Sequence, residues 1–434
     1  MAEGADAAGI EARLLLAELS RSTHDEGLAS SADEVMAATA PDVDAARWAA
    51  SGAMHLTGHA RRPPLLPRAP VASRLAGAAA VWTHLSGLPL DGPALLGERA
   101  AFRGLSRRGT TSAGGGSRIL RAADGWVAVT LSRPDDRELV PAWLQVDDDA
   151  DETISDAVAV APAATTAAAG QELGLAVAVV PPPSASSDEQ QIARGTHPWL
   201  ISLGDGPAAR GRLRVLDLSA LWAGPLCANL LGLAGADVLT VDSVGRPDGA
   251  RLGDPDLFAL LHKGHASVPV DLRQRDDRSR LGELIGAADV VITSVRPRAL
   301  AQLDLWPHDQ VARRPGLTWV AITAYGLTGP WANRVGYGDD AAAAGGLVAE
   351  DGTPVFCADA AADPSTGLYA AIAGMAVARA GGGVVDVALR EVAHHLSRGP
   401  HRTEPVPLRP DGNGWQVVTP GGPVPVALPR ARTA

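Results

Sequence analysis

From residue 212 onward the sequence alternates between short apolar runs and helical runs, and this alternation constrains the fold most. The apolar runs are typical of buried strands, and they lie at residues 213–218, 238–241, 266–272, 289–293 and 317–323. The runs between them have the spacing of helices, at residues 226–233, 279–285 and 298–303. Strands that alternate with helices favour β-α-β units and a parallel sheet. We therefore predict an α/β fold with a Rossmann-like domain over residues 212–400.

The first 180 residues follow a different pattern, which predicts a smaller α+β domain. Leucine and alanine spacing favours helices at residues 10–20 and 69–85. Residues 119–131 read as a hairpin around Asp124-Gly125, a pair typical of tight turns, and residues 174–180 read as a strand. The stretch PPPSASS at residues 181–187 predicts a linker, which we extend over residues 181–211. Residues 401–434 are then a C-terminal tail.

Composition argues against several classes of partner. The chain has 434 residues, and 38 basic against 49 acidic side chains give a net charge of −11, which is unfavourable for a general nucleic-acid binder. Two cysteines suit a reducing compartment, so we expect a cytoplasmic location. The acidic N-terminus lacks the features of a signal peptide, and we find no apolar run of about 18 residues, so no membrane partner is expected.

Common cofactor and hydrolase motifs are missing. The turn after the first predicted strand, SALWAGPLC, lacks the G-x-G-x-x-G that lets a backbone approach a pyrophosphate, which disfavours NAD binding. Neither a P-loop nor a G-x-S-x-G nucleophile elbow occurs. His394 and His395 are adjacent on a predicted helix and point in different directions, so no zinc pattern is present and no metal is expected.

Four basic residues lie near the predicted strand ends or in the loops that follow. These are Arg246, Arg251, Lys263 and Arg296. Ligands of open parallel sheets favour the carboxyl ends of the strands. Each residue alone is more often a solvated surface charge, but several together could hold a nucleotide phosphate.

The segment ADPSTG places Asp363 directly before Pro364 and a helical run. One interpretation is structural, because Asp at the N-cap and Pro at the first helical position begin a helix without any chemistry. The other is catalytic. A carboxylate at a helix N-terminus is stabilised in its ionised form by the helix dipole, and in a shielded site it can attack an activated acyl group.

The order of several segments resembles CoA-transferase family III, the CaiB/BaiF or formyl-CoA transferase type. The similar segments are RVLDLSALWAGPLCANLLGLAGADVLTVD (residues 214–242), HKGHASVPVDL (262–272), ADVVITSVRP (288–297), AITAYGLTGP (321–330), VGYGDDAAAAGGL (335–347) and ADPSTG. In this arrangement Asp363 falls at the position of the family's catalytic aspartate.

The resemblance implies an acyl-CoA:carboxylate CoA-transferase that forms interlocked homodimers and has CoA as a substrate rather than a permanent cofactor. It implies that Asp363 attacks the acyl-CoA thioester to give a mixed anhydride, that CoA returns to give an aspartyl-CoA thioester, and that an acceptor carboxylate displaces it. CoA is expected at Ala223, Gly224 and Pro225, with its phosphates near Arg246, Arg251, Lys263 and Arg296. Gly114, Gly115 and Gly116 would form a lid that excludes water.

The chain also departs from the family's order. Segments SGAMHLTGHARRPP (residues 51–64) and AGGGSRILRAADGWVAV (113–129) resemble parts that flank or follow the catalytic aspartate, yet here they come first. We interpret this as a permuted or partly duplicated order, in which the first copy has no aspartate near Ala69. Two alternatives stay open, an α-methylacyl-CoA racemase and a non-catalytic CoA-binding protein. The racemase is less favoured because no histidine lies near residues 336–340.

Overall fold

A computed structural model describes residues 7–37, 44–182, 188–195, 197–399, 402, 405–412 and 414–433. Residues 183–187, at the centre of the predicted linker, lie outside the described part of the chain. Among the described helices, none combines the length and the apolar character needed to cross a membrane.

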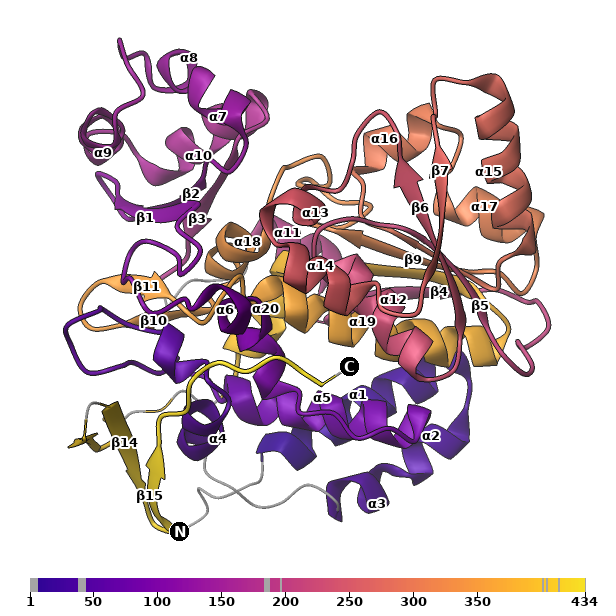
Figure 1. Cartoon of the computed structure of the whole chain (residues 1–434), viewed down its shortest axis with the longest axis horizontal. Helices are drawn as coiled ribbons and strands as arrows, with labels where there is room; N and C mark the ends of the chain where they lie inside the picture. The colour runs from indigo at the N-terminus through magenta and orange to yellow at the C-terminus, as the bar shows by residue number, and fades with distance from the viewer. Residues whose placement is uncertain are drawn as a thin grey trace.

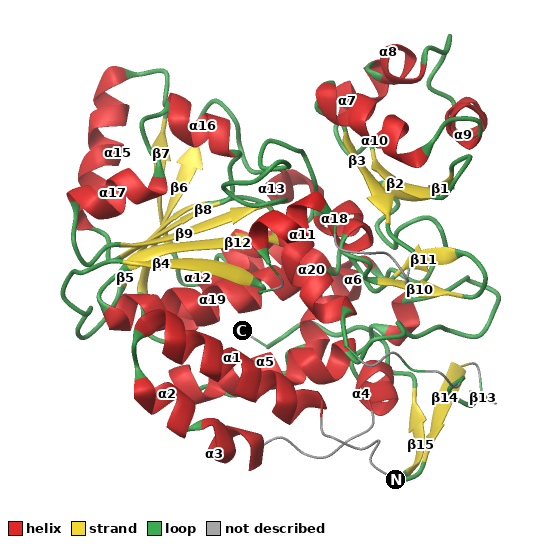
Figure 2. Ribbon diagram, turned by 180° about the vertical axis from the view of Figure 1, so that it is seen from behind, coloured by secondary structure: helices red, strands yellow, loops and turns green. Residues whose placement is uncertain are grey.

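A seven-stranded sheet forms the largest element of the protein (Figures 1 and 2). Its order is β4-β12-β9-β8-β5-β6-β7, with every pair parallel except the edge pair of β4 and β12. The strands are β4 (Trp199–Leu203), β5 (Arg214–Leu218), β6 (Asp237–Ser243), β7 (Ala266–Val270), β8 (Val290–Thr293), β9 (Thr318–Thr323) and β12 (Gly383–Ala388). This architecture confirms the predicted α/β class, and each of the five predicted strands is present.

Helices cover both faces of this sheet, which explains why strands β8, β9 and β12 are buried along their whole length. One face packs against α12 (Ala223–Leu233) and α19 (Ala362–Ala380). The other packs against α15 (Arg275–Ala287), α16 (Pro297–Gln302) and α17 (Pro307–Arg313). The chain moves outward from β5 to β7 and, on the other side, from β8 to β12. The order therefore reverses between β5 and β8, where open α/β sheets commonly bind ligands.

A smaller domain contains the predicted hairpin. Strands β1 (Ser117–Arg121), β2 (Trp126–Thr130) and β3 (Ala176–Val180) form an antiparallel sheet. One face has its own core with helices of the same domain, and the other packs against α18 (Gly338–Ala344) and Phe356. The helices of this domain are α7 (Pro134–Glu138), α8 (Val140–Leu144), α9 (Asp151–Ala159) and α10 (Ala163–Glu172).

The two ends of the chain pack onto the main domain. Helices α1 (Ala7–Thr23) and α5 (Val71–Ser86) lie against α19, where Tyr369 donates a hydrogen bond of 2.8 Å to the buried Glu11. The final residues return to the N-terminal region, because Arg432 donates to Glu98 at 2.6 Å. The remaining elements are α2 (Glu26–Ser30), α3 (Ala32–Ala37), α4 (Asp44–Ala50), α6 (Glu98–Arg103), α11 (Glu189–Arg194), α13 (Gly249–Gly253), α14 (Pro255–Leu261), α20 (Leu389–Ser397), the 3₁₀ helices η1 (Met54–Leu56) and η2 (Pro93–Gly97), and strands β10 (Val348–Glu350), β11 (Pro354–Phe356), β13 (Leu408–Asp411), β14 (Gly414–Thr419) and β15 (Gly422–Pro425).

Two segments are more ordered than the sequence suggested. Residues 181–211, which we predicted as a linker, contribute β4 to the edge of the large sheet. Residues 401–434, predicted as a tail, contain the antiparallel sheet β13-β14-β15. Strand β4 pairs with β12, which is far away in the sequence, so the local sequence gives little indication of it. Strands β13, β14 and β15 instead pair with their neighbours in the sequence. The proposed division into domains otherwise stays a prediction.

Candidate functional site

Asp363 lies in the first turn of α19, as the segment ADPSTG suggested, but it is not the N-cap. The N-cap is Ala361, which makes no side-chain capping bond, and Asp363 is the second helical residue. The structural interpretation of Asp363 as a helix cap is therefore wrong. Its side chain is partly buried, so the position of this carboxylate needs another explanation than helix capping.

The Asp363 carboxylate rests on the first residue of α18. The backbone N–H of Gly338 donates a hydrogen bond to it. A β-carbon added at Gly338 would lie 2.3 Å from Oδ2 of Asp363 and 2.7 Å from the carbonyl oxygen of Ala360. The close approach is possible only because residue 338 has no side chain.

Two further carboxyl groups lie within electrostatic reach of Asp363, those of Asp339 and Asp359. Asp339 accepts a hydrogen bond from the backbone N–H of Ala360 at 3.0 Å, and Asp359 is fully buried. The next residue, Asp340, accepts from the Thr130 hydroxyl at 2.9 Å and interacts with Asp339. Carboxyl groups in such close proximity repel one another when ionised.

This crowding changes the acidity of the site. Burial raises the pKa of Asp363 to about 7, and the charges of Asp339 and Asp359 add to the effect against the opposing charge of Arg99. Burial also raises the pKa of Asp340 to about 7. We predicted an ionised Asp363 from the helix dipole alone. Loss of solvation opposes the dipole, so this carboxyl group is only partly ionised near neutral pH.

Arg99, in α6, brings a cation to this carboxyl group cluster. Its Nε donates to Asp359 at 2.9 Å and its Nη2 donates to the other oxygen, which makes a two-pronged ion pair. The guanidinium also lies over the ring of Trp222, 5.3 Å from the centroid. The indole of Trp222 is buried, and its N–H has no partner among the described residues.

The backbone around Asp359 is strained. Ala358 and Ala360 have φ values of 55° and 46°, in the left-handed region that disfavours residues with a β-carbon. The surrounding contacts hold this conformation, since Ala358 N–H donates to the buried Thr57 hydroxyl at 3.0 Å. Such outliers concentrate at functional sites.

The glycine segment predicted as a lid adjoins this cluster. Gly114, Gly115 and Gly116 are all exposed. A β-carbon at Gly114 would lie 3.0 Å from Nη2 of Arg99, so the loop passes directly over the ion pair. Its position is compatible with a lid, and movement of the loop stays a prediction.

The residues predicted to contact CoA divide into groups. Ala223, Gly224 and Pro225 are buried at the start of α12, where the Ala223 carbonyl lies against Gly367 of α19. They bring α12 close to α19 one helical turn after Asp363. Little of their surface is open to a ligand.

Two of the predicted phosphate-binding residues do come together. Arg246 and Arg296 follow the carboxyl ends of β6 and β8, and burial and nearby guanidiniums, including Arg298, Arg133 and Arg246, lower the pKa of Arg296. Among the described residues, no carboxylate forms an ion pair with Arg246, Arg296 or Arg298. Tyr337, which precedes Gly338, lies within electrostatic reach of this group.

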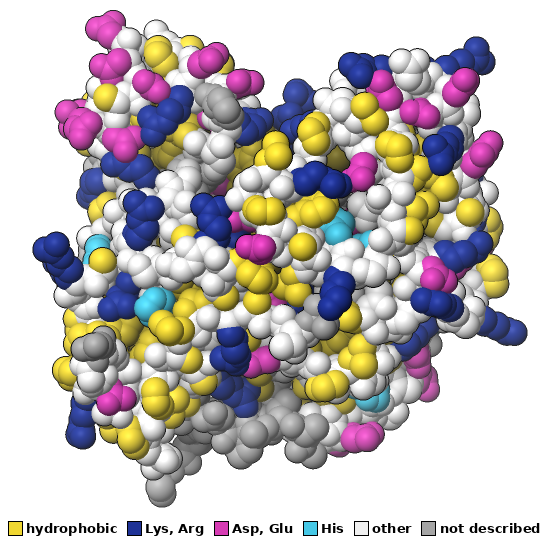
Figure 3. All heavy atoms as spheres, viewed as in Figure 1, with side chains coloured by type: hydrophobic (Ala, Val, Ile, Leu, Met, Phe, Trp, Pro, Cys, Tyr) yellow, Lys and Arg dark blue, Asp and Glu magenta, His cyan; other side chains and the backbone are white. Residues whose placement is uncertain are grey.

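The other two do not join this group. Arg251 pairs with Asp242 at 2.6 Å and stacks over Phe258. Lys263 follows α14 and precedes β7, so it lies towards the amino end of that strand, whereas Arg246 and Arg296 follow carboxyl ends. The parallel order of these strands separates the two ends. The surface view shows an indentation between the small domain and the sheet domain (Figure 3).

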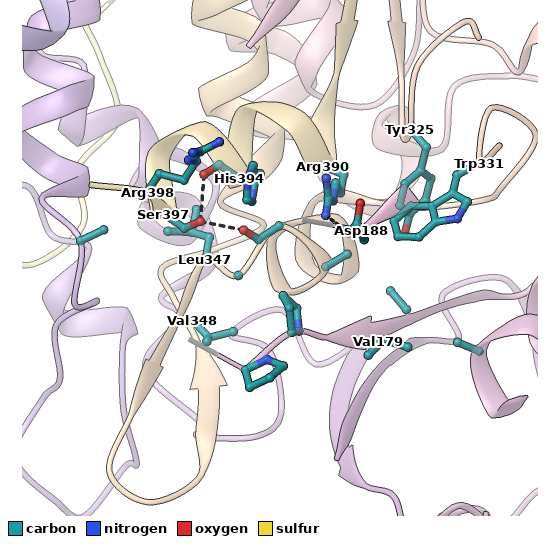
Figure 4. Close-up of a pocket in the computed structure, with 18 of the residues that line it drawn as sticks. Val179, Asp188, Tyr325, Trp331, Leu347, Val348, Arg390, His394, Ser397 and Arg398 are labelled. Atoms are coloured by element: carbon teal, nitrogen blue, oxygen red, sulfur yellow. Dashed lines mark hydrogen bonds and ion pairs between the residues drawn. The ribbon is translucent and has the colours of Figure 1, made fainter. Parts of the chain in front are cut away.

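A cavity in the described part of the chain lies away from Asp363. It has a volume of about 650 Å³ and is lined at the C-terminal end of α18, whereas Asp363 rests on the N-terminal end. Arg390, His394 and Ser397 of α20 form one wall, and Val179 and Val348 lie on the other (Figure 4). Asp363 does not line this cavity.

Sequence reasoning found Asp363 but missed most of its surroundings. Asp339 and Asp340 stand in the segment VGYGDDAAAAGGL, which was used only for the resemblance. Asp359 lies shortly before Asp363 in the sequence, and a search for neighbouring carboxylates could have found it. Arg99 carries no local signal. In the described part of the chain, no group of three or more His, Cys, Asp or Glu is arranged to hold a metal ion.

Known proteins with similar sequences include several CoA-transferases. Residues 212–407 match the model of CoA-transferase family III. The chain is 32% identical over 180 residues to the probable CoA-transferase Rv1866 of Mycobacterium tuberculosis, covering 38% of this chain and 22% of that protein. It is 33% identical over 169 residues to the succinyl-CoA:glutarate CoA-transferase of Mus musculus, covering 36% of this chain and 39% of that protein. The chain thus spans less than half the length of these relatives.

A solved structure gives a weaker likeness. A CAIB/BAIF family protein from Brucella suis has 27% identity and a TM-score of 0.43, covering 48% of this chain and 64% of that one.

Proposed function

Residues 212–407 belong to CoA-transferase family III, and from this premise we propose that the protein is an acyl-CoA:carboxylate CoA-transferase with Asp363 as its nucleophile. The observation that carries the proposal is the Asp363 carboxylate itself. It is partly buried at the start of α19, not used as a helix cap, and held by the N–H of Gly338. Named relatives that act on succinyl-CoA support the class of reaction.

The proposed reaction needs no metal and proceeds in four exchanges. An oxygen of Asp363 attacks the acyl-CoA carbonyl carbon, the C–S bond breaks, and CoA thiolate leaves an aspartyl mixed anhydride. The thiolate attacks the aspartyl carbonyl and releases the first carboxylic acid as its carboxylate, leaving an aspartyl-CoA thioester. The acceptor carboxylate attacks this thioester and again releases thiolate. The thiolate then attacks the new acyl carbonyl, giving the product acyl-CoA and free Asp363.

Several features of the site support this sequence. The Gly338 N–H, at the N-terminus of α18, can stabilise the oxygen that becomes negative when the aspartyl carbonyl is attacked. Gly114, above the ion pair of Arg99 and Asp359, lies where a loop could exclude water from the anhydride. A homodimer remains a prediction from the resemblance, and a cytoplasmic location remains a prediction from the two cysteines.

The acidity of Asp363 predicts a pH dependence for its acylation. Only the ionised carboxylate attacks, and its pKa is raised to about 7. Because the protonated fraction falls as pH rises, the single-turnover rate of acyl-enzyme formation should increase about tenfold per pH unit below 7 and level off above it. Rapid quenching between pH 5 and 9 measures this rate. A rate that is constant over this range would place the pKa near its ordinary value and contradict the argument.

Placement of the CoA phosphates gives a second prediction. Arg296→Gln should raise KM for acyl-CoA about tenfold, since the guanidinium has no carboxylate partner among the described residues and is free to pair with a phosphate. Lys263→Gln should leave KM unchanged, because Lys263 lies towards the amino end of β7. Steady-state kinetics of both variants test the assignment, and the reverse pattern would restore Lys263 to the site.

A further inference from the structure

The surroundings of Asp363 create a difficulty for the second substrate. The acceptor of the proposed reaction is a carboxylate, which must approach a region that already holds Asp339 and Asp359. Like charges at short range repel strongly where solvent is excluded. A cation is therefore needed at the point where the acceptor enters.

Arg99 is the cation that lies within this cluster. It is within electrostatic reach of Asp363, Asp339 and Asp359. Only one edge of the guanidinium is committed, because Nε and Nη2 donate to Asp359. Among the described residues, none accepts a hydrogen bond from Nη1, and the side chain is 21% exposed. The two hydrogen bonds to Asp359 and the contact with the ring of Trp222 fix the plane of the guanidinium group, and therefore the direction in which Nη1 points.

The loop that contains Gly114 leaves space for a ligand to reach Arg99. Gly114 is exposed and has no side chain, and a β-carbon there would lie 3.0 Å from Nη2. A larger residue at this position would press on the guanidinium. The loop and α6 both precede residue 212, so they lie outside the segment that matches the family model.

We propose that Arg99 binds the acceptor carboxylate and orients it for attack on the aspartyl-CoA thioester of Asp363. The proposal rests on the proposed function. One oxygen of the acceptor pairs with Arg99 while the other attacks the aspartyl carbonyl carbon. The new C–O bond replaces the C–S bond, and CoA thiolate leaves. Arg99 keeps its charge throughout, so no proton has to move.

Two assays separate the proposed role of Arg99 from the chemistry of Asp363. Exchange of labelled CoA into acyl-CoA, without acceptor, requires only acylation of Asp363. Overall transfer also requires the acceptor. Arg99→Lys keeps a positive charge but loses the planar guanidinium group that donates two hydrogen bonds to Asp359. The double variant R99Q/D359N removes both partners, so no buried charge is left alone. Arg103→Gln, on the same helix with an exposed pair to Asp254, is the matched control.

We expect both Arg99 variants to retain CoA exchange within a few-fold and to raise KM for the acceptor about 10- to 100-fold, the loss typical of a charge-assisted hydrogen bond. Arg103→Gln should behave like wild type. An unchanged acceptor KM in R99Q/D359N, or a rise only in the KM for acyl-CoA, would overturn the proposal. Absence of CoA exchange in the wild type would instead mean that the proposed function fails.

Discussion

Asp363→Asn is expected to abolish CoA transfer, with a loss of at least about 10³-fold, because an amide cannot form the mixed anhydride. The fold should be retained. Asparagine preserves the size of the side chain, and Asp363 is neither the helix cap nor part of an ion pair among the described residues. Thioester turnover and thermal unfolding of the same preparation measure the two effects.

Stability should change in a defined direction with pH. The folded-state pKa of Asp363 is raised to about 7, above its unfolded value, so wild type loses stability as pH rises from about 4 to 7. The asparagine variant lacks this loss. Its unfolding temperature should equal that of wild type near pH 4 or below and exceed it at pH 8. For the activity, an Asp363→Asn variant that transfers CoA at a near wild-type rate would show that Asp363 is not the nucleophile.

Gly338→Ala is expected to damage both stability and activity. The new β-carbon would lie 2.3 Å from Oδ2 of Asp363 and 2.7 Å from the Ala360 carbonyl, so backbone or carboxylate must move. Such overpacking costs about 1–3 kcal/mol. Displacement of a nucleophile by about 1 Å can cost about 100-fold in rate. Denaturant unfolding and steady-state kinetics test the two parts.

Gly282→Ala provides the control for this substitution. Gly282 lies within α15, and a β-carbon there meets nothing within 4 Å. Alanine should stabilise that helix by about 0.5–1 kcal/mol and leave activity unchanged. If Gly338→Ala behaved in the same way, the close approach of α18 to Asp363 would have no role in the site.

Five of the seven strands of the large sheet could be predicted, because their signals are local. Each is a short apolar run followed by a turn or helix, and burial on both faces produces that pattern. Strands β4 and β12 were not predicted; they pair with each other, and this pairing joins residues far apart in the sequence. The hairpin of β1 and β2 was predicted from its turn, Asp124-Gly125.

The candidate site was only partly predictable for the same reason. Asp363 was found because a helix start and a resemblance coincide in one short segment. Its most important neighbour in our proposal, Arg99, is paired with Asp359 across 260 residues of sequence. The raised pKa of Asp363 was not predicted, because the helix dipole could be seen in the sequence, whereas burial and the charges of Asp339 and Asp359 could not.

The role of Asp363 as nucleophile can be tested by trapping the acyl-enzyme. Wild type is mixed with an acyl-CoA, quenched with hydroxylamine or borohydride, digested and examined by mass spectrometry. We expect an aspartyl hydroxamate, or the reduced product of the aspartyl thioester, on the peptide that contains Asp363. Neither product should form in Asp363→Asn. An enzyme that turns over without a modified Asp363, or that carries the modification on another residue, would contradict this role.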